Sequence, residues 1–242
     1  MGDTLVIIPA FNEEKLILQT LQPLLELKLQ ADVLVINDGS TDHTGSLIRG
    51  LPIYRVNHPV NLGYGAALQS GFQFAAANGY RYVVQFDADG QHDPEDLKRM
   101  IEEIHCNDAD VVIGSRFLGN PRFNPGWMKS FAIRIFRAII YVLSGKRVTD
   151  PTSGLRGLSA RVFRYYSGRG RFPSDFPDAD IIIHMLLNRF TLREFPIGSR
   201  ERKQGTSMHS GVRPVIYIFK VTLSILAVIL NHNLNVRRDL DA

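Results

Sequence analysis

Two carboxylates and an amide stand close together in the sequence at Asp87, Asp89 and Gln91, directly after a short apolar run at residues 82–86. The run is rich in β-forming residues, which predicts a buried strand. Residues two apart on an extended chain point the same way, so Asp87 and Asp89 can present oxygens to one small volume, with the Gln91 amide nearby. Hard divalent cations prefer such oxygen ligands and take one or two carboxylates together with substrate phosphates. The spacing therefore predicts a metal site at the end of this strand.

Acids that follow a strand are also common in turns and helix caps, and Asp93 followed by Pro94 has the pattern of a helix start. A calcium-binding EF-hand loop is excluded, because it needs glycine at its sixth position and an acid at its twelfth. Counting from Asp87, these positions hold His92 and Lys98. Phosphatases that form an aspartyl-phosphate carry a similar motif after their first strand, whereas three strand-like runs precede it here.

Strand-like and helix-like segments alternate along most of the chain. Predicted strands lie at residues 4–8, 31–36, 53–56, 82–86, 111–114 and 191–197. Predicted helices lie at residues 13–27, 93–105, 136–143 and 178–188, with a further helix that follows Gly65 and ends near Asn78. This alternation argues for a parallel α/β sheet, whose ligands bind beyond the carboxyl ends of the strands. The polar motifs of the first half lie at such ends.

The composition suits one domain with a single core. At 242 residues and 45% hydrophobic content, the chain can bury one substantial core and carry an elaborated C-terminal part. Its one cysteine, Cys106, excludes an internal disulfide and a multi-cysteine zinc site. The apolar run at residues 5–9 is far too short for a signal peptide, so we expect a cytoplasmic protein.

Basic residues are unevenly distributed. The net charge is only +4, but basic side chains crowd into residues 116–147, 161–171 and 189–203. A basic second half suits phosphate-bearing substrates or an anionic membrane surface. We expect no nucleic-acid partner, because the sequence has no basic stripe with interleaved aromatic residues.

The last apolar run, residues 215–230, contains Lys220 and is shorter than the roughly 20 residues that a membrane-spanning helix needs. One interpretation is a docked or interfacial helix, with Arg237 and Arg238 meeting lipid headgroups. The other is an ordinary C-terminal core helix, because the run is apolar on all its faces.

Four motifs follow one another along the chain: Pro9-Ala10-Phe11-Asn12-Glu13, Asn37-Asp38-Gly39-Ser40-Thr41-Asp42, Asp87-Ala88-Asp89-Gly90-Gln91 and Gly114-Ser115-Arg116. With these motifs in this order and spacing, the chain resembles glycosyltransferase family 2 over at least residues 4–207. The resemblance implies the GT-A fold, a Rossmann-like α/β architecture with a mostly parallel sheet flanked by helices, followed here by the C-terminal apolar helix. It also implies a nucleotide-sugar donor and transfer with inversion at the anomeric carbon.

The resemblance also suggests how the chain is divided. We expect a catalytic domain at residues 1–210, with a nucleotide-sugar-binding half at 1–116 and an acceptor-binding half at 117–210. The remainder, 211–242, would be an interfacial helix and a basic tail.

Two later segments are similar to those of the polyprenyl-phosphate glycosyltransferases, the group that includes dolichyl-phosphate mannose synthase. They are Asp150-Pro151-Thr152-Ser153-Gly154-Leu155-Arg156 and Arg202-Lys203-Gln204-Gly205-Thr206-Ser207. One departure is that many relatives have a basic residue directly after the last serine, where this chain has Met208. Lys203 or His209 would then substitute in holding the acceptor phosphate.

The resemblance implies roles for individual residues. The nucleoside would be held by Pro9, Phe11, Glu13, Ile36 and Asp38, and the donor also by Asp87 and Ala88. A Mg²⁺ or Mn²⁺ ion would be bound by Asp87, Asp89 and Gln91. The acceptor phosphate would be bound by Arg116, Arg202 and Lys203. The catalytic residues would be Asp89, Arg116, Asp150 and Arg202.

The role of Asp150 depends on the acceptor. A lipid phosphate, with a second pKa near 6, is largely ionised at neutral pH and hardly needs a general base. Asp150 would then position the acceptor or orient a basic residue. A sugar hydroxyl would need a base, for which Asp150 is the candidate. The simplest alternative is a turn, since Asp before Pro favours one without any chemistry.

The leading hypothesis is metal-dependent transfer of a hexose or N-acetylhexosamine, from a UDP-sugar rather than a GDP-sugar, to a polyprenyl phosphate at the cytoplasmic membrane face. Transfer to a hydroxyl on a growing polysaccharide and a non-catalytic nucleotide-sugar-binding protein are the alternatives. A sugar-phosphate nucleotidyltransferase would be expected to have a glycine-rich basic loop where residues 9–14 stand. A small membrane protein and a second copy of the chain are candidate partners.

Overall fold

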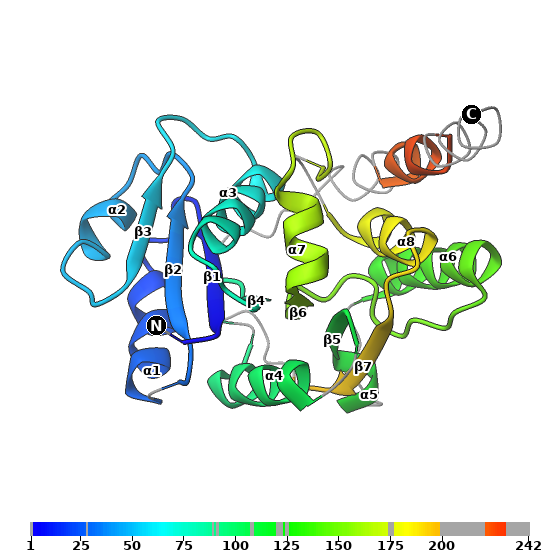
Figure 1. Ribbon diagram of the computed structural model, residues 1–242, viewed down its shortest axis with the longest axis horizontal. Helices are drawn as coiled ribbons and strands as arrows, with labels where there is room; N and C mark the ends of the chain where they lie inside the picture. Colours follow the sequence, from blue (N-terminus) through cyan, green and yellow to red (C-terminus); the bar gives the residue numbers. More distant parts are fainter. Residues whose placement is uncertain are drawn as a thin grey trace.

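The computed structural model describes residues 2–27, 29–88, 90, 92–106, 109–119, 123, 126–173, 177–198 and 221–230. Within these residues, one sheet has the strand order β3-β2-β1-β4-β6-β5-β7 (Figure 1). The strands are β1 (Thr4–Ala10), β2 (Asp32–Asn37), β3 (Tyr54–Asn57), β4 (Tyr82–Gln85), β5 (Val111–Ser115), β6 (Arg156–Ser159) and β7 (Leu192–Pro196). Neighbouring strands pair in parallel except at β6, which is antiparallel to both β4 and β5.

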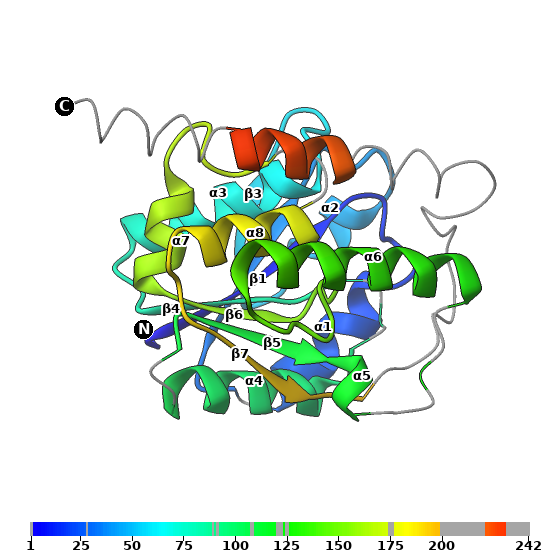
Figure 2. The same cartoon turned by 90° about the vertical axis from the view of Figure 1, so that its right-hand side faces the viewer.

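Helices cover both faces of the sheet (Figures 1 and 2). They are α1 (Ile17–Glu26), α2 (Thr44–Leu47), α3 (Tyr64–Ala77), α4 (Pro94–Cys106), α5 (Arg116–Gly119), α6 (Trp127–Ser144), α7 (Ala160–Ser167) and α8 (Ala179–Leu187). Residues 221–230 are also helical. The arrangement is the three-layered α/β architecture that the alternation of segments predicts.

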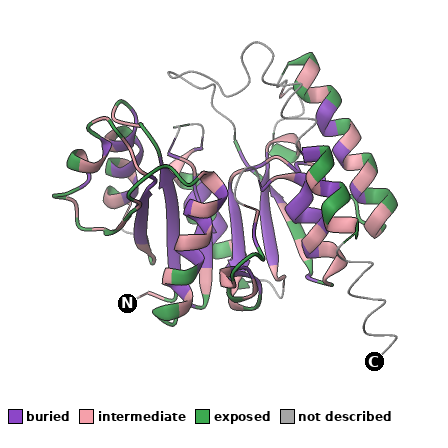
Figure 3. Cartoon of the chain, turned by 90° about the horizontal axis from the view of Figure 1, so that it is seen from above, coloured by how far each residue is buried: buried purple, intermediate pink, exposed green. Residues whose placement is uncertain are grey.

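Side chains alternate between the two faces of each strand, so the sheet separates two hydrophobic clusters. Leu5 and Ile7 of β1 belong to the cluster under α3, α6, α7 and α8, whereas Val6 and Ile8 belong to the cluster under α1 and α4. Figure 3 shows the strands buried between the partly exposed helices. A strand buried on both faces reads as a continuous apolar run, which is why β1 is recognisable in the sequence.

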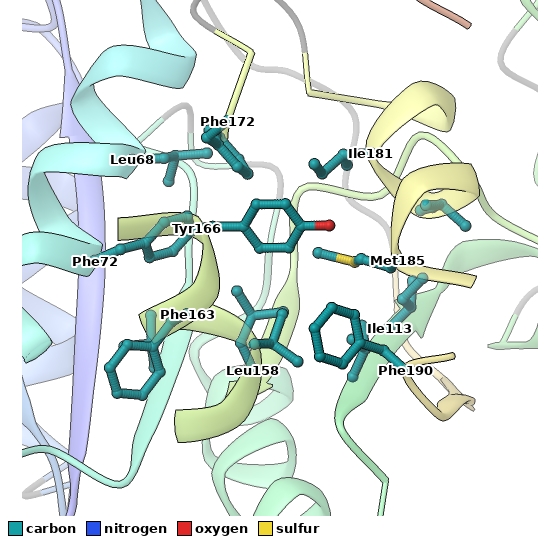
Figure 4. Packing of buried hydrophobic residues seen from close by; sticks show 14 of the residues in the cluster. Leu68, Phe72, Ile113, Leu158, Phe163, Tyr166, Phe172, Ile181, Met185 and Phe190 are labelled. Atoms are coloured by element: carbon teal, nitrogen blue, oxygen red, sulfur yellow. The ribbon is translucent and has the colours of Figure 1, made fainter. Parts of the chain in front are cut away.

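Aromatic rings fill the larger cluster. Tyr166 of α7 lies among Phe72, Phe172 and Met185 (Figure 4). The ring of Phe172 meets that of Phe72 edge-on at 5.1 Å between centroids and that of Tyr166 at 5.4 Å. These contacts join α3 to the helices of the second half, so the two halves of the chain share one core.

The predicted strands are present with small shifts at their ends, and two predicted helices differ in their starts. Helix α1 begins at Ile17 and not at Glu13. The backbone N–H groups of Glu13 and Glu14, in the segment before it, donate to Thr44 Oγ1 and Asp42 Oδ2 of the next motif. Helix α6 begins at Trp127, nine residues before the predicted start at 136.

Strand β6 and helix α7 were not predicted. The β6 sequence, Arg-Gly-Leu-Ser, lacks the apolar alternation of a strand, and its pairing with β4 and β5 comes from distant parts of the chain. Gly157 leaves room for α4, since a Cβ there would lie 2.9 Å from the Met100 sulfur and 3.2 Å from the Ile104 Cβ. Gly157 interrupts the apolar pattern by which a strand is recognised in a sequence, and it also allows α4 to pack closely on β6.

The C-terminal apolar run is described only at residues 221–230, where it is helical; residues 215–220, Arg237 and Arg238 lie outside the described part. Val221 and Ile225 are buried in the larger cluster, and the Ser224 hydroxyl donates to Asp180 of α8. One side of this helix therefore packs on the domain. In the portion of the chain that the structure covers, no helix combines the length and apolarity needed to cross a bilayer.

Candidate active site

Four polar segments meet at one edge of the sheet because β1, β2, β4 and β5 run in the same direction. In the register of the sheet, Pro9 lies beside Ile36 and Ala10 beside Asn37, so the first two motifs follow neighbouring strands. Asp87 comes two residues after the end of β4, and Arg116 directly after β5. Sequence segments more than a hundred residues apart are thus brought to the carboxyl edge, where α/β proteins bind ligands.

The first two motifs hold each other. Asn12 has a left-handed backbone conformation with φ of 54°, and its Oδ1 accepts a hydrogen bond of 2.8 Å from the Thr41 N–H. In return, the Asn12 N–H donates to Ser40 Oγ at 3.0 Å. Phe11, Glu13 and Asp38, which are predicted to hold the nucleoside, lie next to these residues in the sequence. The mutual hydrogen bonds therefore fix the two loops relative to each other.

The Asp38 carboxylate accepts hydrogen bonds from a neighbouring loop. Its oxygens accept hydrogen bonds from the Leu62 and Gly63 N–H groups, both at 2.9 Å, and lie 2.6 Å from His58 Nδ1. Only 3% of Asp38 is exposed. The loop approaches so closely that a Cβ at Gly39, whose φ is 67°, would lie 2.3 Å from a backbone carbon of Val60. Asp38 therefore shapes the 58–63 loop.

The other residues predicted to hold the nucleoside differ in accessibility. Pro9 and Ile36 are buried within their strands, whereas Phe11 is 45% exposed and Glu13 is half-buried. Exposed at the carboxyl edge, the Phe11 ring is available for stacking on a flat ligand. The strand residues instead set the positions of the loops that follow them.

Asp87 has a constrained carboxylate. The Tyr64 hydroxyl donates to its Oδ1 at 2.7 Å, and His92 Nε2 lies 3.9 Å from its Oδ2. Burial raises the pKa of the Asp87 carboxyl, although Tyr64 and Arg156 act in the opposite direction. A carboxylate that is partly shielded from water gains from a nearby cation, so its surroundings fit a bound metal ion.

The loop of the Asp150 motif reaches this carboxylate. A Cβ on Gly154 would lie 1.9 Å from Asp87 Oδ2, so any larger residue here would force the loop or the carboxylate to move. Ala88, the next residue after Asp87, is buried, and its carbonyl accepts a hydrogen bond from Thr20. The other predicted metal ligands, Asp89 and Gln91, lie outside the described residues.

Asp150 and Arg116 form a bidentate pair. Arg116 Nε and Nη2 donate to the two Asp150 carboxylate oxygens at 2.7 and 2.8 Å, and the Arg116 N–H adds a third bond of 3.1 Å. Asp150 has no exposed surface. Burial lowers the pKa of Arg116, but Asp150 outweighs this effect and the net shift is upward. The carboxylate thus orients a permanent cation toward the edge of the sheet.

Glu194 of β7 binds the backbone of the loop that contains Asp150. Its Oε1 accepts the Asp150 N–H at 2.9 Å, and its Oε2 accepts the Thr149 N–H at 2.7 Å. Burial raises the pKa of Glu194, although these hydrogen bonds lower it. The Arg137 guanidinium of α6 donates to the Thr149 carbonyl, which ties the same loop to a helix.

Sequence reasoning assigned no role to Tyr64, Arg156 or Glu194. Arg156 is 3% exposed, and its guanidinium donates to the Pro177 carbonyl at 2.7 Å and to the Pro151 carbonyl at 3.2 Å. Arg156 ends the Asp150 motif, a signal that was present in the sequence, whereas nothing local marks Tyr64 or Glu194. Two predicted phosphate ligands, Arg202 and Lys203, lie outside the described residues together with Met208 and His209.

Residues 5–167 match the model of a protein family described as "Glycosyl transferase family 2". The polyprenol monophosphomannose synthase of Mycolicibacterium smegmatis is 30% identical to this chain over 226 residues, which cover 90% of this chain and 85% of the relative. The UDP-N-acetylglucosamine–dolichyl-phosphate N-acetylglucosaminyltransferase of Methanococcus voltae is 30% identical over 217 residues, which cover 81% of this chain and 86% of the relative.

The fold is similar to that of glucosyl-3-phosphoglycerate synthase from Mycobacterium tuberculosis, solved with Mn²⁺ and UDP-glucose. The TM-score is 0.68 at 20% identity, with 92% of this chain and 78% of that chain covered. At this identity the similarity concerns the fold alone, and it confirms the expected GT-A architecture.

Proposed function

The chain belongs to glycosyl transferase family 2 and is a glycosyltransferase, and on this premise we propose that it transfers a sugar from a nucleotide sugar to a polyprenyl phosphate. The observation that carries the proposal is the convergence of Asp87 with the Arg116–Asp150 pair through Gly154. This arrangement puts a carboxylate suited to a metal ion beside a guanidinium suited to phosphate.

The donor would lie along the carboxyl edge. The loops after β1 and β2, joined through Asn12 and Thr41, would hold the nucleoside, with Phe11 accessible to it and Asp38 shaping the 58–63 loop. Asp87, Asp89 and Gln91 would hold Mg²⁺ or Mn²⁺ against the diphosphate. When bound, the ion supplies positive charge that stabilises the leaving nucleoside diphosphate.

In the transfer step, an oxygen of the acceptor phosphate forms a bond to the anomeric carbon from the face opposite the leaving group. The bond between that carbon and the diphosphate oxygen breaks, and the configuration inverts. Arg116, held by Asp150, would offer its fixed charge to phosphate, together with Arg202 and Lys203. No proton has to be removed from an acceptor that is already ionised.

The environment of Asp150 favours the phosphate acceptor over a sugar hydroxyl. Both of its carboxylate oxygens accept hydrogen bonds from Arg116, and Oδ1 accepts a further one from Thr152 at 3.2 Å. A general base needs an oxygen within reach of the substrate proton. Asp150 is therefore better placed to orient Arg116 than to deprotonate a hydroxyl.

The relatives named above act on polyprenyl or dolichyl phosphates, with mannose in one case and N-acetylglucosamine in the other. We accordingly propose a hexose or N-acetylhexosamine donor, with UDP favoured over GDP. Because the acceptor is a membrane lipid, the enzyme would work at the inner face of the cell membrane as a peripheral protein. A small membrane protein and a second copy of the chain remain candidate partners.

The test is transfer from a panel of labelled UDP- and GDP-sugars to undecaprenyl phosphate with Mg²⁺ or Mn²⁺. Controls are EDTA and the substitution Asp89→Ala. Label that reaches the lipid only with metal and with Asp89 intact would support the donor, the acceptor class and the metal site together. A donor that binds metal-dependently without any transfer to lipid phosphate, but with transfer to a hydroxyl acceptor, would contradict the proposed acceptor.

A further inference from the structure

Helix α6 has a second apolar side that the described part of the domain leaves exposed. Its inner side, with Ala132, Ile133, Phe136 and Ile140, is buried in the larger cluster. A second set of side chains repeats at intervals of three and four residues and faces away from the core, which is the spacing of one helix face. We call this set the outer face of α6; it consists of Trp127, Phe131, Arg134, Ala138, Tyr141 and Val142.

The large apolar side chains of the outer face are highly exposed to solvent. Trp127 and Val142 are each 80% exposed, Phe131 58% and Tyr141 50%. Isolated exposed apolar residues are normal on protein surfaces, but a contiguous row of large ones marks a place of interaction. Figure 2 shows α6 on the side of the molecule that faces the viewer, with α8 beside it and the helix at residues 221–230 beyond α8.

The charges on and after this helix have one sign. From Trp127 to Arg147 the sequence contains no acidic residue, while Arg134 lies within the outer face and Lys146 and Arg147 follow its end. The Arg147 guanidinium lies over the Tyr141 ring, at 5.8 Å from its centroid. Tryptophan and tyrosine among basic side chains are typical of helices at the headgroup level of a membrane, where the rings enter the boundary and the cations meet anionic lipids.

The position of α6 relates this face to the candidate active site. Arg137, on the same helix, donates to the Thr149 carbonyl, beside the Asp150 that binds Arg116. A lipid surface that contacts α6 would therefore lie close to the loop that contains Asp150, where the acceptor would bind. A lipid headgroup surface fits this location, since the acceptor of the proposed reaction is itself a membrane lipid.

We propose that the outer face of α6 docks on an anionic lipid surface. This inference rests on the proposed function for its biological setting and names the surface that would meet the membrane. It differs from attachment through the C-terminal run, whose helix at residues 221–230 buries Val221 and Ile225 against the domain. The competing occupant of the face is a second copy of the chain.

Trp127 is the one tryptophan in the sequence, so the tryptophan fluorescence of this chain reports from the outer face itself. The experiment mixes the protein with vesicles of phosphatidylcholine alone or with added phosphatidylglycerol, without nucleotide sugar or polyprenyl phosphate. We expect a blue shift of the emission, protection from acrylamide and co-sedimentation with the anionic vesicles. Binding should weaken as salt is added, because surface charges are screened within about 10 Å at 0.1 M ionic strength.

The variant carrying Phe131→Ser and Arg134→Glu should bind anionic vesicles at least about tenfold more weakly. The matched control carries Tyr54→Ser and Arg49→Glu, the same kinds of change at exposed positions near β3, at the opposite edge of the sheet. It should bind like the unmodified protein. Thermal unfolding of both variants checks that each is folded.

Unchanged Trp127 emission with anionic vesicles, or equal binding by the outer-face and control variants, would overturn the proposal. A blue shift that grows with protein concentration in the absence of lipid, together with a dimer in sedimentation, would assign the face to a second copy and also overturn it. Vesicle binding without sugar transfer would count against the proposed function alone. Transfer to a short, water-soluble polyprenyl phosphate without vesicle binding would count against the docking surface alone.

Discussion

At the edge of the sheet, the Asp87 carboxylate is held by groups from three separate parts of the chain. Tyr64 from α3 donates to it, Gly154 leaves room for it, and His92 lies 3.9 Å away. We propose Asp87 as a metal ligand, and since such a ligand works only in one orientation, these neighbours would decide whether its carboxylate is ready to bind the ion. Two substitutions test separately the hydrogen bond from Tyr64 and the space that Gly154 leaves for the carboxylate.

Tyr64→Phe removes the hydroxyl that orients Asp87 and keeps the ring. Loss of such an outer partner typically costs about ten- to a hundredfold in metal affinity, and we expect a loss of this size. Calorimetric titration of Mn²⁺ into the protein with a UDP-sugar measures it. Tyr80→Phe is the matched control, because its hydroxyl donates to Asp32 at the start of β2. Equal affinities in the two variants would contradict the role given to Tyr64.

Gly154→Ala places a methyl group where the Asp87 carboxylate lies, so either the loop or the carboxylate must move. Displacement of a reacting group by about 1 Å can cost on the order of a hundredfold in rate, and we expect kcat/KM to fall by about this factor. Gly50→Ala serves as the comparison, since a Cβ there meets nothing within 4 Å. Full transferase activity in the Gly154 variant would show that the close approach is unimportant.

At the scale of the elements, the loop before β6 is positioned by its neighbours in the sheet. Glu194 on β7 accepts the N–H groups of Thr149 and Asp150, while Arg137 on α6 donates to the Thr149 carbonyl. The antiparallel strand β6 follows this loop directly and lies between β4 and β5. The Asp150 motif is thereby brought between the ends of β4 and β5, where Asp87 and Arg116 stand.

Glu194→Gln tests this support. The glutamine keeps the shape but loses the negative charge, and its NH2 group replaces one of the two oxygens that accept hydrogen bonds from the Thr149 N–H. We expect a loss of about 1 to 3 kcal/mol in the free energy of unfolding. Urea denaturation measures it, with Glu102→Gln on the exposed side of α4 as the control. A Glu194 variant as stable as the control would mean that the loop is held by other contacts.

At the scale of the whole molecule, helices from both halves of the chain share the larger hydrophobic cluster, and helix 221–230 joins it. Asp180 of α8 is buried there beside Ser224, and burial raises its pKa above the ordinary value of 3.8. A buried carboxyl with a raised pKa favours the folded state most when protonated. Its contribution is therefore complete below the unfolded pKa and is lost as the pH rises through the folded pKa.

Asp180→Asn removes this titration. The free energy of unfolding of the variant, relative to the unmodified protein, should increase as the pH is raised from the ordinary aspartate pKa through the raised one. Asp42→Asn should show the opposite trend: burial raises the pKa of Asp42, but hydrogen bonds from Thr44 and Glu14 outweigh this and the net shift is downward. Denaturation curves across a pH series measure both. Parallel pH profiles for the two variants would contradict the argument.

The sequence by itself determined the alternation of strands and helices and the motifs at the strand ends. Buried strands such as β1 must be continuously apolar, and loops that turn sharply need residues such as Gly39, so both leave local patterns. The family, the GT-A fold and the glycosyltransferase activity were predicted from the resemblance that those motifs carry, and the comparisons confirm them. The roles assigned to individual residues, including Asp89, Gln91 and Arg202, stay predictions.

Only the tertiary structure decided which side chains meet. The antiparallel β6, the Arg116–Asp150 pair, the contact of Gly154 with Asp87 and the commitment of Asp38 to the 58–63 loop all join residues far apart in the sequence. A local pattern records the faces and ends of an element, because these repeat with its period. It does not record which distant element packs against it, since that depends on the volume and hydrogen bonding of the assembled core.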